Sequence, residues 1–176
     1  RQIEWIADNM YSRNIKYVIH MGDLIEGYVK NLLDWDFDAY AEQWRCARGS
    51  MEVLSELGIP FGIFPGNHDE DSSVNPFQDS YKDYFPIDNY SKRTGFVGSL
   101  NDMTSNAWEV PIGNKRYLFI NVEDLGFPIG GFNIKDRNNI QNWMKSILFD
   151  YRGENDRVIL STHSFAKTDG SFYNYA

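Results

Sequence analysis

Three apolar runs of this 176-residue sequence end in side chains of the kinds that bind metal ions. Carboxylate, amide and imidazole groups are the ligands that hard and borderline divalent cations take in proteins. A carboxylate has two oxygens and can bridge two ions, and Asp23 is the residue that we expect to do so. Any one such residue is weak evidence, because an Asp or Asn after a glycine often marks a turn and a lone histidine often packs or caps. The residues at the three run ends are Asp23; Asn67, His68 and Asp69; and His163.

The apolar runs themselves, residues 16–21, 61–64 and 157–162, have the length and composition of buried strands. In open α/β sheets, sites form at the carboxyl ends of the strands, so residues far apart in sequence can meet at one edge. We therefore expect Asp23, Asn67 and His163 to converge. Together these endings favour a metal site over unrelated turn and cap residues.

Apolar residues at steps of three and four predict three helices that pack against these strands. Asn14 can end the first helix, Gly58 and Pro60 end the second, and Gly153 follows the third. The apolar positions are Ile3, Ile6, Ala7 and Met10 in the first helix, Tyr40, Trp44, Ala47, Met51 and Leu54 in the second, and Ile140, Trp143, Met144, Ile147, Leu148 and Tyr151 in the third.

The remaining segments predict a hairpin and a long loop. Alternating apolar residues flank Gly113 and Asn114, a pair that tolerates the positive φ angles of a tight β-turn. Residues 69–103 are rich in Asp, Asn, Ser and Tyr and predict a functional loop region with one short helix around residues 76–84. Strands that alternate with helices and include a hairpin indicate an α/β fold with mixed sheets, over one domain of residues 1–176.

Three short motifs resemble the calcineurin-like metallophosphoesterases. The motifs are Gly22-Asp23, the GNHD run from Gly66 to Asp69, and Thr162-His163, and their order and spacing match that family over nearly the whole chain. The resemblance implies a layered α/β/β/α sandwich. It also implies a phosphate mono- or diester as substrate, hydrolysed by a water that two divalent metal ions activate, with Mn, Fe, Zn, Mg and Ni all compatible.

The resemblance implies a role for each site residue. Asp23 would bridge both metal ions, and Asn67 and His163 would bind one of them. His68 would contact the phosphate and protonate the leaving oxygen. Asp69 would be the acid that orients the ring of His68.

Other positions depart from the family pattern. An Asp-x-His-type motif before the first helix and a closing Gly-His-x-His motif are absent from the 176 residues, so we expect the chain to be incomplete at both ends and nearly inactive alone. Glu26 stands where the family has a second Asp, and we expect it to contact the metal-binding residues without binding an ion itself. We expect His20 to pack within its strand.

Composition narrows the classes of function. A net charge of −8 argues against broad binding of nucleic-acid backbones. The single cysteine, Cys46, allows neither an intrachain disulfide nor a cysteine-rich zinc site. No apolar run approaches the about 20 residues of a membrane span, so we expect a soluble chain. Its oligomeric state and its localisation stay open, and an extracellular location, with the leader missing from this sequence, is one of the options.

Two alternative functions stay open at this point. A catalytically inactive domain of the same fold would keep the site residues for binding or scaffolding. A different metal hydrolase, such as an amidase, would place similar ligands at strand ends but gives no reason for the GNHD run.

Overall fold

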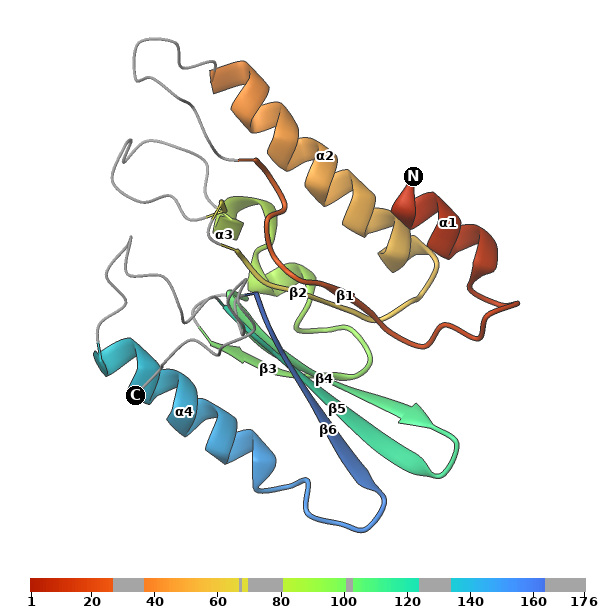
Figure 1. The fold of residues 1–176 in the computed structure, drawn as a ribbon, viewed down its shortest axis with the longest axis vertical. Helices are drawn as coiled ribbons and strands as arrows, with labels where there is room; N and C mark the ends of the chain where they lie inside the picture. The colour runs from red at the N-terminus through yellow and green to blue at the C-terminus, as the bar shows by residue number, and fades with distance from the viewer. Residues whose placement is uncertain (27–36, 67, 70–80, 101–102, 124–133, 164–176) are drawn as a thin grey trace, which may run out of the picture.

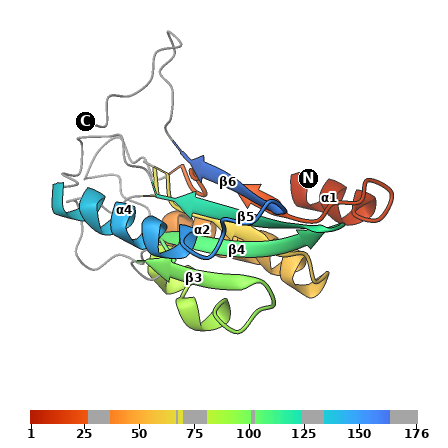
Figure 2. The ribbon, with the colours of Figure 1, turned by 90° about the horizontal axis from the view of Figure 1, so that it is seen from below.

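Helices cover the outer faces of two β-sheets in the computed structural model, which describes residues 1–26, 37–66, 68–69, 81–100, 103–123 and 134–163. The elements are α1 (Gln2–Asn9), β1 (Val18–His20), α2 (Phe37–Glu56), β2 (Phe61–Ile63), α3 (Tyr81–Tyr84), the 3-10 helix η2 (Ile87–Asn89), β3 (Phe96–Leu100), β4 (Ser105–Ile112), β5 (Lys115–Val122), α4 (Ile134–Leu148) and β6 (Asp156–Thr162). Figure 1 shows α1 and α2 beside the β1–β2 pair and α4 on the far side of the larger sheet. Figure 2 shows the same layers from below, with α4 along one face of β3 to β6. The predicted layered α/β fold is confirmed.

Both sheets contain parallel strands. In the smaller sheet β1 runs parallel to β2, with His20 opposite Ile63. The larger sheet has the order β3-β4-β5-β6, in which β5 and β6 are parallel and the other pairs are antiparallel, so it is mixed as expected. The β4–β5 hairpin turns at Gly113, which has a φ of +63°, and Asn114, between the paired residues Ile112 and Lys115. The hairpin prediction is confirmed.

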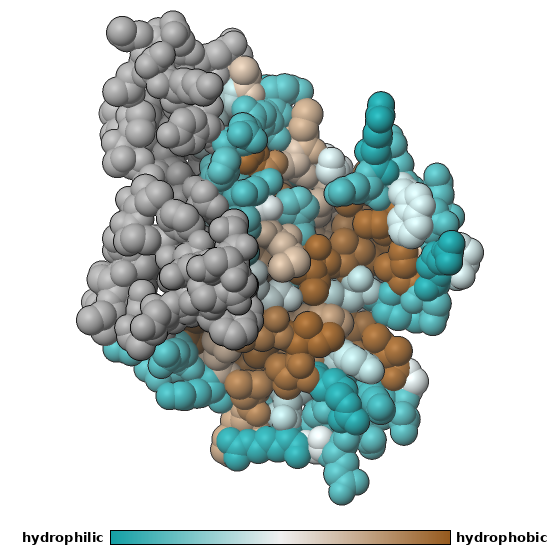
Figure 3. Space-filling view, viewed as in Figure 1, coloured by the Kyte–Doolittle hydropathy of each residue, from teal (hydrophilic) through white to brown (hydrophobic). Residues whose placement is uncertain are grey.

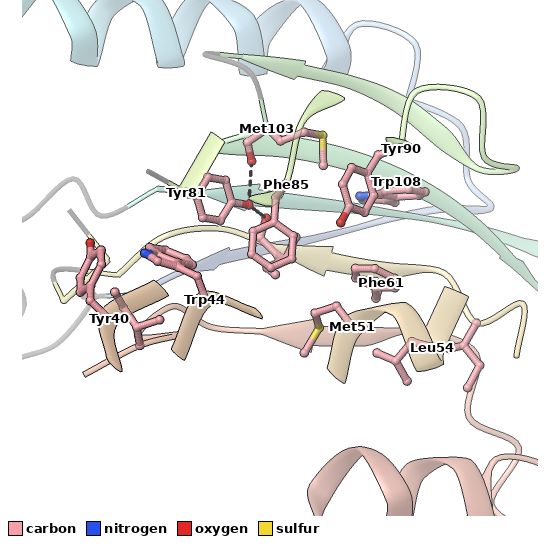
Figure 4. Close-up of a cluster of buried hydrophobic side chains, with 13 residues drawn as sticks. Tyr40, Trp44, Met51, Leu54, Phe61, Tyr81, Phe85, Tyr90, Met103 and Trp108 are labelled. Atoms are coloured by element: carbon pink, nitrogen blue, oxygen red, sulfur yellow. Dashed lines mark hydrogen bonds between the residues drawn. The ribbon is translucent and has the colours of Figure 1, made fainter. Parts of the chain in front are cut away.

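Two apolar clusters hold these layers together. The larger cluster joins α2, β2, α3 and β4, and aromatic rings make up much of it, including Trp44, Phe85 and Trp108 (Figure 4). The ring of Trp44 also stacks on that of Tyr84 at a centroid distance of 5.6 Å. The smaller cluster joins β4 and β5 to Ile140 of α4. All three predicted helical faces pack against these clusters, although the residues of α1 are only partly buried.

The segment predicted as a long loop contains more regular structure than expected. Its described part holds α3, η2 and β3, and β3 pairs antiparallel with β4. The strand was missed because Gly98 and Ser99 give it a weak intrinsic preference, while pairing with β4 supplies the stabilisation. Residues 70–80, which include the start of the predicted short helix, lie outside the described residues.

The last strand carries exposed apolar side chains at the edge of the larger sheet. Val158, Ile159 and Leu160 are 43%, 38% and 54% exposed. Figure 3 shows hydrophobic surface gathered across the middle of this face, over the strands. In the described parts of the chain, no helix combines the length and the apolar character that crossing a membrane requires.

Candidate metal and active site

Asp23 stands on a tight turn that follows β1. Gly22 and Asp23 both have positive φ angles, +81° and +52°. Aspartate is among the few residues with a side chain that enter this left-handed region readily, because its short polar group can find local hydrogen bonds. The turn brings Oδ1 of Asp23 to 3.1 Å from the backbone nitrogen of His68, which donates a hydrogen bond to it.

Two glycines let the turns after β1 and β2 touch. A Cβ atom on Gly22 would lie 2.7 Å from the backbone of Gly66 and 2.8 Å from Nδ1 of His163. A Cβ atom on Gly66 would overlap Oδ1 of Asp23 and approach Cε1 of His163 to 2.9 Å. The glycines of the GD and GNHD motifs are therefore needed for the close approach of three separate segments.

His163 follows β6 and faces Asp23. Its Nδ1 lies 2.6 Å from the backbone oxygen of Met21, and because a carbonyl only accepts, Nδ1 carries the proton. In the neutral ring Nε2 then has the lone pair, and it lies 3.4 Å from Oδ2 of Asp23. A histidine that donates one ring N–H to a carbonyl and presents the other nitrogen is the usual arrangement of a metal ligand.

His68 is held by the backbone of the first turn. Its Nδ1 donates a hydrogen bond of 2.7 Å to the carbonyl oxygen of Glu26. The backbone N–H of Glu26 in turn donates to Oε1 of Gln43 on α2, at 2.8 Å. Glu26 therefore contributes to the site through its main chain, and its residue is exposed.

Asp69 is buried and its carboxylate binds backbone groups of both turns, while its role in orienting the ring of His68 stays a prediction. It is 2% exposed, and its two carboxylate oxygens accept hydrogen bonds from the backbone nitrogens of Ile25, at 3.0 Å, and Gly66, at 2.8 Å. Burial raises the pKa of this carboxyl, and the backbone hydrogen bonds work against that rise. Asp69 ties the two turns together, because one of its oxygens holds the backbone of Ile25 and the other that of Gly66.

Four of the five predicted site residues therefore lie around one contact. Asp23, His68, Asp69 and His163 meet there, and Asn67 lies outside the described residues. Among the residues that the structure describes, no three His, Cys, Asp or Glu side chains are grouped to hold a metal ion. The donors that fit one are the carboxylate of Asp23 and Nε2 of His163, a hard oxygen and a borderline nitrogen.

A cleft of about 830 Å³ opens beside this contact. Asp23, Glu26 and His68 line it together with α1, α2 and His20. Burial lowers the pKa of His20, and its Nδ1 is buried with no hydrogen-bond partner among the described residues. His20 is thus partly buried in the wall of the cleft, which agrees with the prediction that it packs within its strand.

One buried acid at the same edge was missed in the sequence. Glu123 is 5% exposed and directly follows β5, in which Val122 is paired with Thr162 of β6. Glu123 therefore follows Val122 just as His163 follows Thr162, at the same edge of the sheet. The rule that selected the other residues, a polar group at the end of an apolar strand, also selects Glu123.

Comparison with known proteins identifies the family of the chain. The model of the calcineurin-like phosphoesterase family matches residues 1–175, and the chain belongs to that family. The chain is also similar to the uncharacterized protein YvnB of Bacillus subtilis (strain 168), with 29% identity over 172 residues. That match covers 97% of this chain but spans only 12% of the length of YvnB.

Proposed function

We propose that the protein hydrolyses phosphate mono- or diesters with divalent metal ions that Asp23, Asn67 and His163 help to hold. The contact between Asp23 and His163 carries the proposal. Since Nδ1 of His163 is committed to Met21, its Nε2 and Oδ2 of Asp23 face each other at 3.4 Å. Two ligands with bonds of about 2.0–2.2 Å to one ion can stand at such a separation.

The proposed ligands bind different ions. Asp23 would bind both ions, and Asn67 and His163 would bind one of the two. When bound, such ions lower the pKa of a water molecule and neutralise charge on the phosphoryl oxygens. Asp69 keeps the turns of Asp23 and His68 at a fixed separation, because its carboxylate holds the backbone of both.

His68 is the proposed proton donor to the leaving oxygen. Its Nδ1 proton is engaged with Glu26, so Nε2 is the nitrogen that can take up and release a proton. The ring keeps the same hydrogen bond in both protonation states, so its orientation does not change during transfer. A positioned general acid of this kind typically contributes 10²- to 10⁴-fold in rate.

The test uses the three histidines of the sequence as a matched set, in the natural full-length polypeptide. With Mn²⁺ and either bis(p-nitrophenyl) phosphate or p-nitrophenyl phosphate, His68→Gln should lose about 10²- to 10⁴-fold in kcat while keeping its bound metal. His163→Gln should lose metal and turnover together. His20→Gln, the control, should keep both.

Two results would contradict the proposal. Equal loss of metal and turnover in His68→Gln would remove the general-acid role. Failure of the wild-type polypeptide to hydrolyse either ester with Mn²⁺, Zn²⁺ or Mg²⁺ would favour the alternative of an inactive binding or scaffolding domain.

A further inference from the structure

A buried polar cluster lies at the carboxyl end of β2, behind the candidate site. The backbone oxygens of Ile63 and Met103 each accept hydrogen bonds from two side chains. The hydroxyl of Tyr81 lies 3.0 Å from the oxygen of Ile63 and 3.2 Å from that of Met103 (Figure 4). The side-chain nitrogen of Asn106 lies 2.5 Å and 3.1 Å from the same two oxygens.

The orientation of the Asn106 amide is determined by its other neighbours. The indole nitrogen of Trp108 can only donate, and it lies 3.0 Å from Oδ1 of Asn106. Nδ2 of Asn121 donates to the same oxygen at 3.0 Å. Both protons of the Asn106 amide are therefore directed at the two carbonyls, and all four of its hydrogen bonds are satisfied in a residue that is 0% exposed.

This cluster is close in sequence to the contact that forms the site. Ile63 is the last residue of β2, and only Phe64 and Pro65 separate it from Gly66, which packs against Asp23 with no room for a Cβ atom. Proline restricts the backbone of this short connection. A shift of the Ile63 carbonyl is therefore passed on to Gly66.

The backbone of Met103 shows that the cluster constrains its surroundings. Met103 has a φ of +76°, a region that few residues other than glycine adopt, and its side chain is fully buried. Such a conformation persists only when the surrounding structure holds it, and here Tyr81 and Asn106 both hold its carbonyl.

We propose that Tyr81 and Asn106 are positioning residues for the site: they fix the end of β2, and through it the turn of Gly66, His68 and Asp69 against Asp23. Neither side chain has to touch a substrate or a metal ion for this role. The effect on hydrolysis rests on the proposed function, but the effect on the geometry of the turn does not.

Tyr81→Phe tests the proposal with Tyr90→Phe as its matched control. Each change removes one hydroxyl from a tyrosine that is 3% or 4% exposed, and Tyr90 packs on Phe61, at the opposite end of β2 from Ile63. The NMR signals of the His68 and His163 rings, assigned with His→Gln variants, report the position of the turn. Both sets of ring signals should shift in Tyr81→Phe and stay at their wild-type positions in Tyr90→Phe.

Kinetics of the natural full-length polypeptide add a second measurement. Tyr81→Phe should lower kcat with Mn²⁺ about tenfold to a hundredfold with KM little changed, since a misplaced catalytic group affects the chemical step. Tyr90→Phe should keep the wild-type kcat. Asn106→Asp, which replaces the two N–H donors by an acceptor, should act as Tyr81→Phe does if it folds.

The outcomes separate the two proposals. Unchanged ring signals of His68 and His163 in folded Tyr81→Phe would overturn the positioning role, as would equal shifts in Tyr90→Phe. A wild-type polypeptide that hydrolyses no phosphate ester would contradict the proposed function, while the ring signals would still decide whether Tyr81 positions the turn.

Discussion

Charged side chains at the two ends of the larger sheet are balanced in different ways. Near the amino ends of β5 and β6, Arg116 forms a two-pronged ion pair with Asp156, at 2.8 Å and 2.9 Å, and lies 3.6 Å from Glu109. Tyr151 also donates a 2.7 Å hydrogen bond to Glu109. At the carboxyl end, Asp23 faces His163, and within the described part of the chain it has no lysine or arginine partner.

The difference separates a cluster that balances its own charges from one that would hold metal ions under the proposed function. The Arg116 cluster contains its own cation, so its carboxylates need nothing from solution. At the other end, Oδ2 of Asp23 and Nε2 of His163 face each other beside an open cleft. Under the proposed function, a divalent cation would bind both groups.

The largest effect is expected from comparing one substitution at each end of the larger sheet, Asp23→Ala and Arg116→Leu, by hydrolysis and by Tm. Asp23→Ala in the natural full-length polypeptide should lower hydrolysis of bis(p-nitrophenyl) phosphate by at least about 10³-fold and remove bound Mn²⁺, because it deletes the proposed bridging ligand. Tm without metal should fall only modestly: Ala loses the hydrogen bond from His68 and fits the φ of +52° less well, but the Asp23 side chain is 37% exposed. Arg116→Leu should do the reverse, with a lower Tm and unchanged kcat. Loss of hydrolysis in Arg116→Leu would mean that the two ends are not independent.

A smaller effect should follow from adding one methyl group at the site. Gly66→Ala should lower kcat with Mn²⁺ about 10²-fold and lower Tm, because its Cβ atom would overlap Asp23 and press on His163. Gly49→Ala is the control: it lies within α2, has nothing within 4 Å of an added Cβ atom, and should raise stability by about 0.5–1 kcal/mol. Kinetics and thermal unfolding of the two variants give both comparisons. A Gly66→Ala protein with wild-type metal content and kcat would show that the turns can separate.

The fold was easier to predict from the sequence than the hydrogen bonds of the site. Helices and the hairpin follow from local periodicity and from the pair Gly113 and Asn114, which depend on few partners. β3 escaped prediction because its stability comes from pairing with β4 and not from its own residues. For β3, the residues that decide its structure lie in β4, a different segment of the chain.

The site shows the same limit in its polar contacts. Side-chain types at strand ends were enough to select Asp23 and His163, which the structure brings together. The partners of Asp69 and His68 are backbone groups of Ile25, Gly66 and Glu26, and every residue carries such groups. No sequence pattern distinguishes them, so these backbone partners of Asp69 and His68 could not be predicted.

The smallest expected effect is on the pH dependence of stability, and it comes from Asp156 in the Arg116 cluster. The Arg116 guanidinium, followed by the backbone N–H of Gly153, lowers the pKa of Asp156 below its ordinary 3.8. The folded state therefore binds the Asp156 proton less readily than the unfolded state does, so this stabilisation is fully present above pH 3.8 and is lost as the pH falls through the lowered folded pKa. Asp156→Asn should accordingly have a lower Tm than wild type at pH 7, and the gap should close as the pH falls below 3.8. Thermal unfolding of both proteins between pH 7 and pH 2.5 measures it. A gap that stays constant would show that the Asp156 charge does not contribute, and that shape and hydrogen bonding alone hold the Arg116 cluster together.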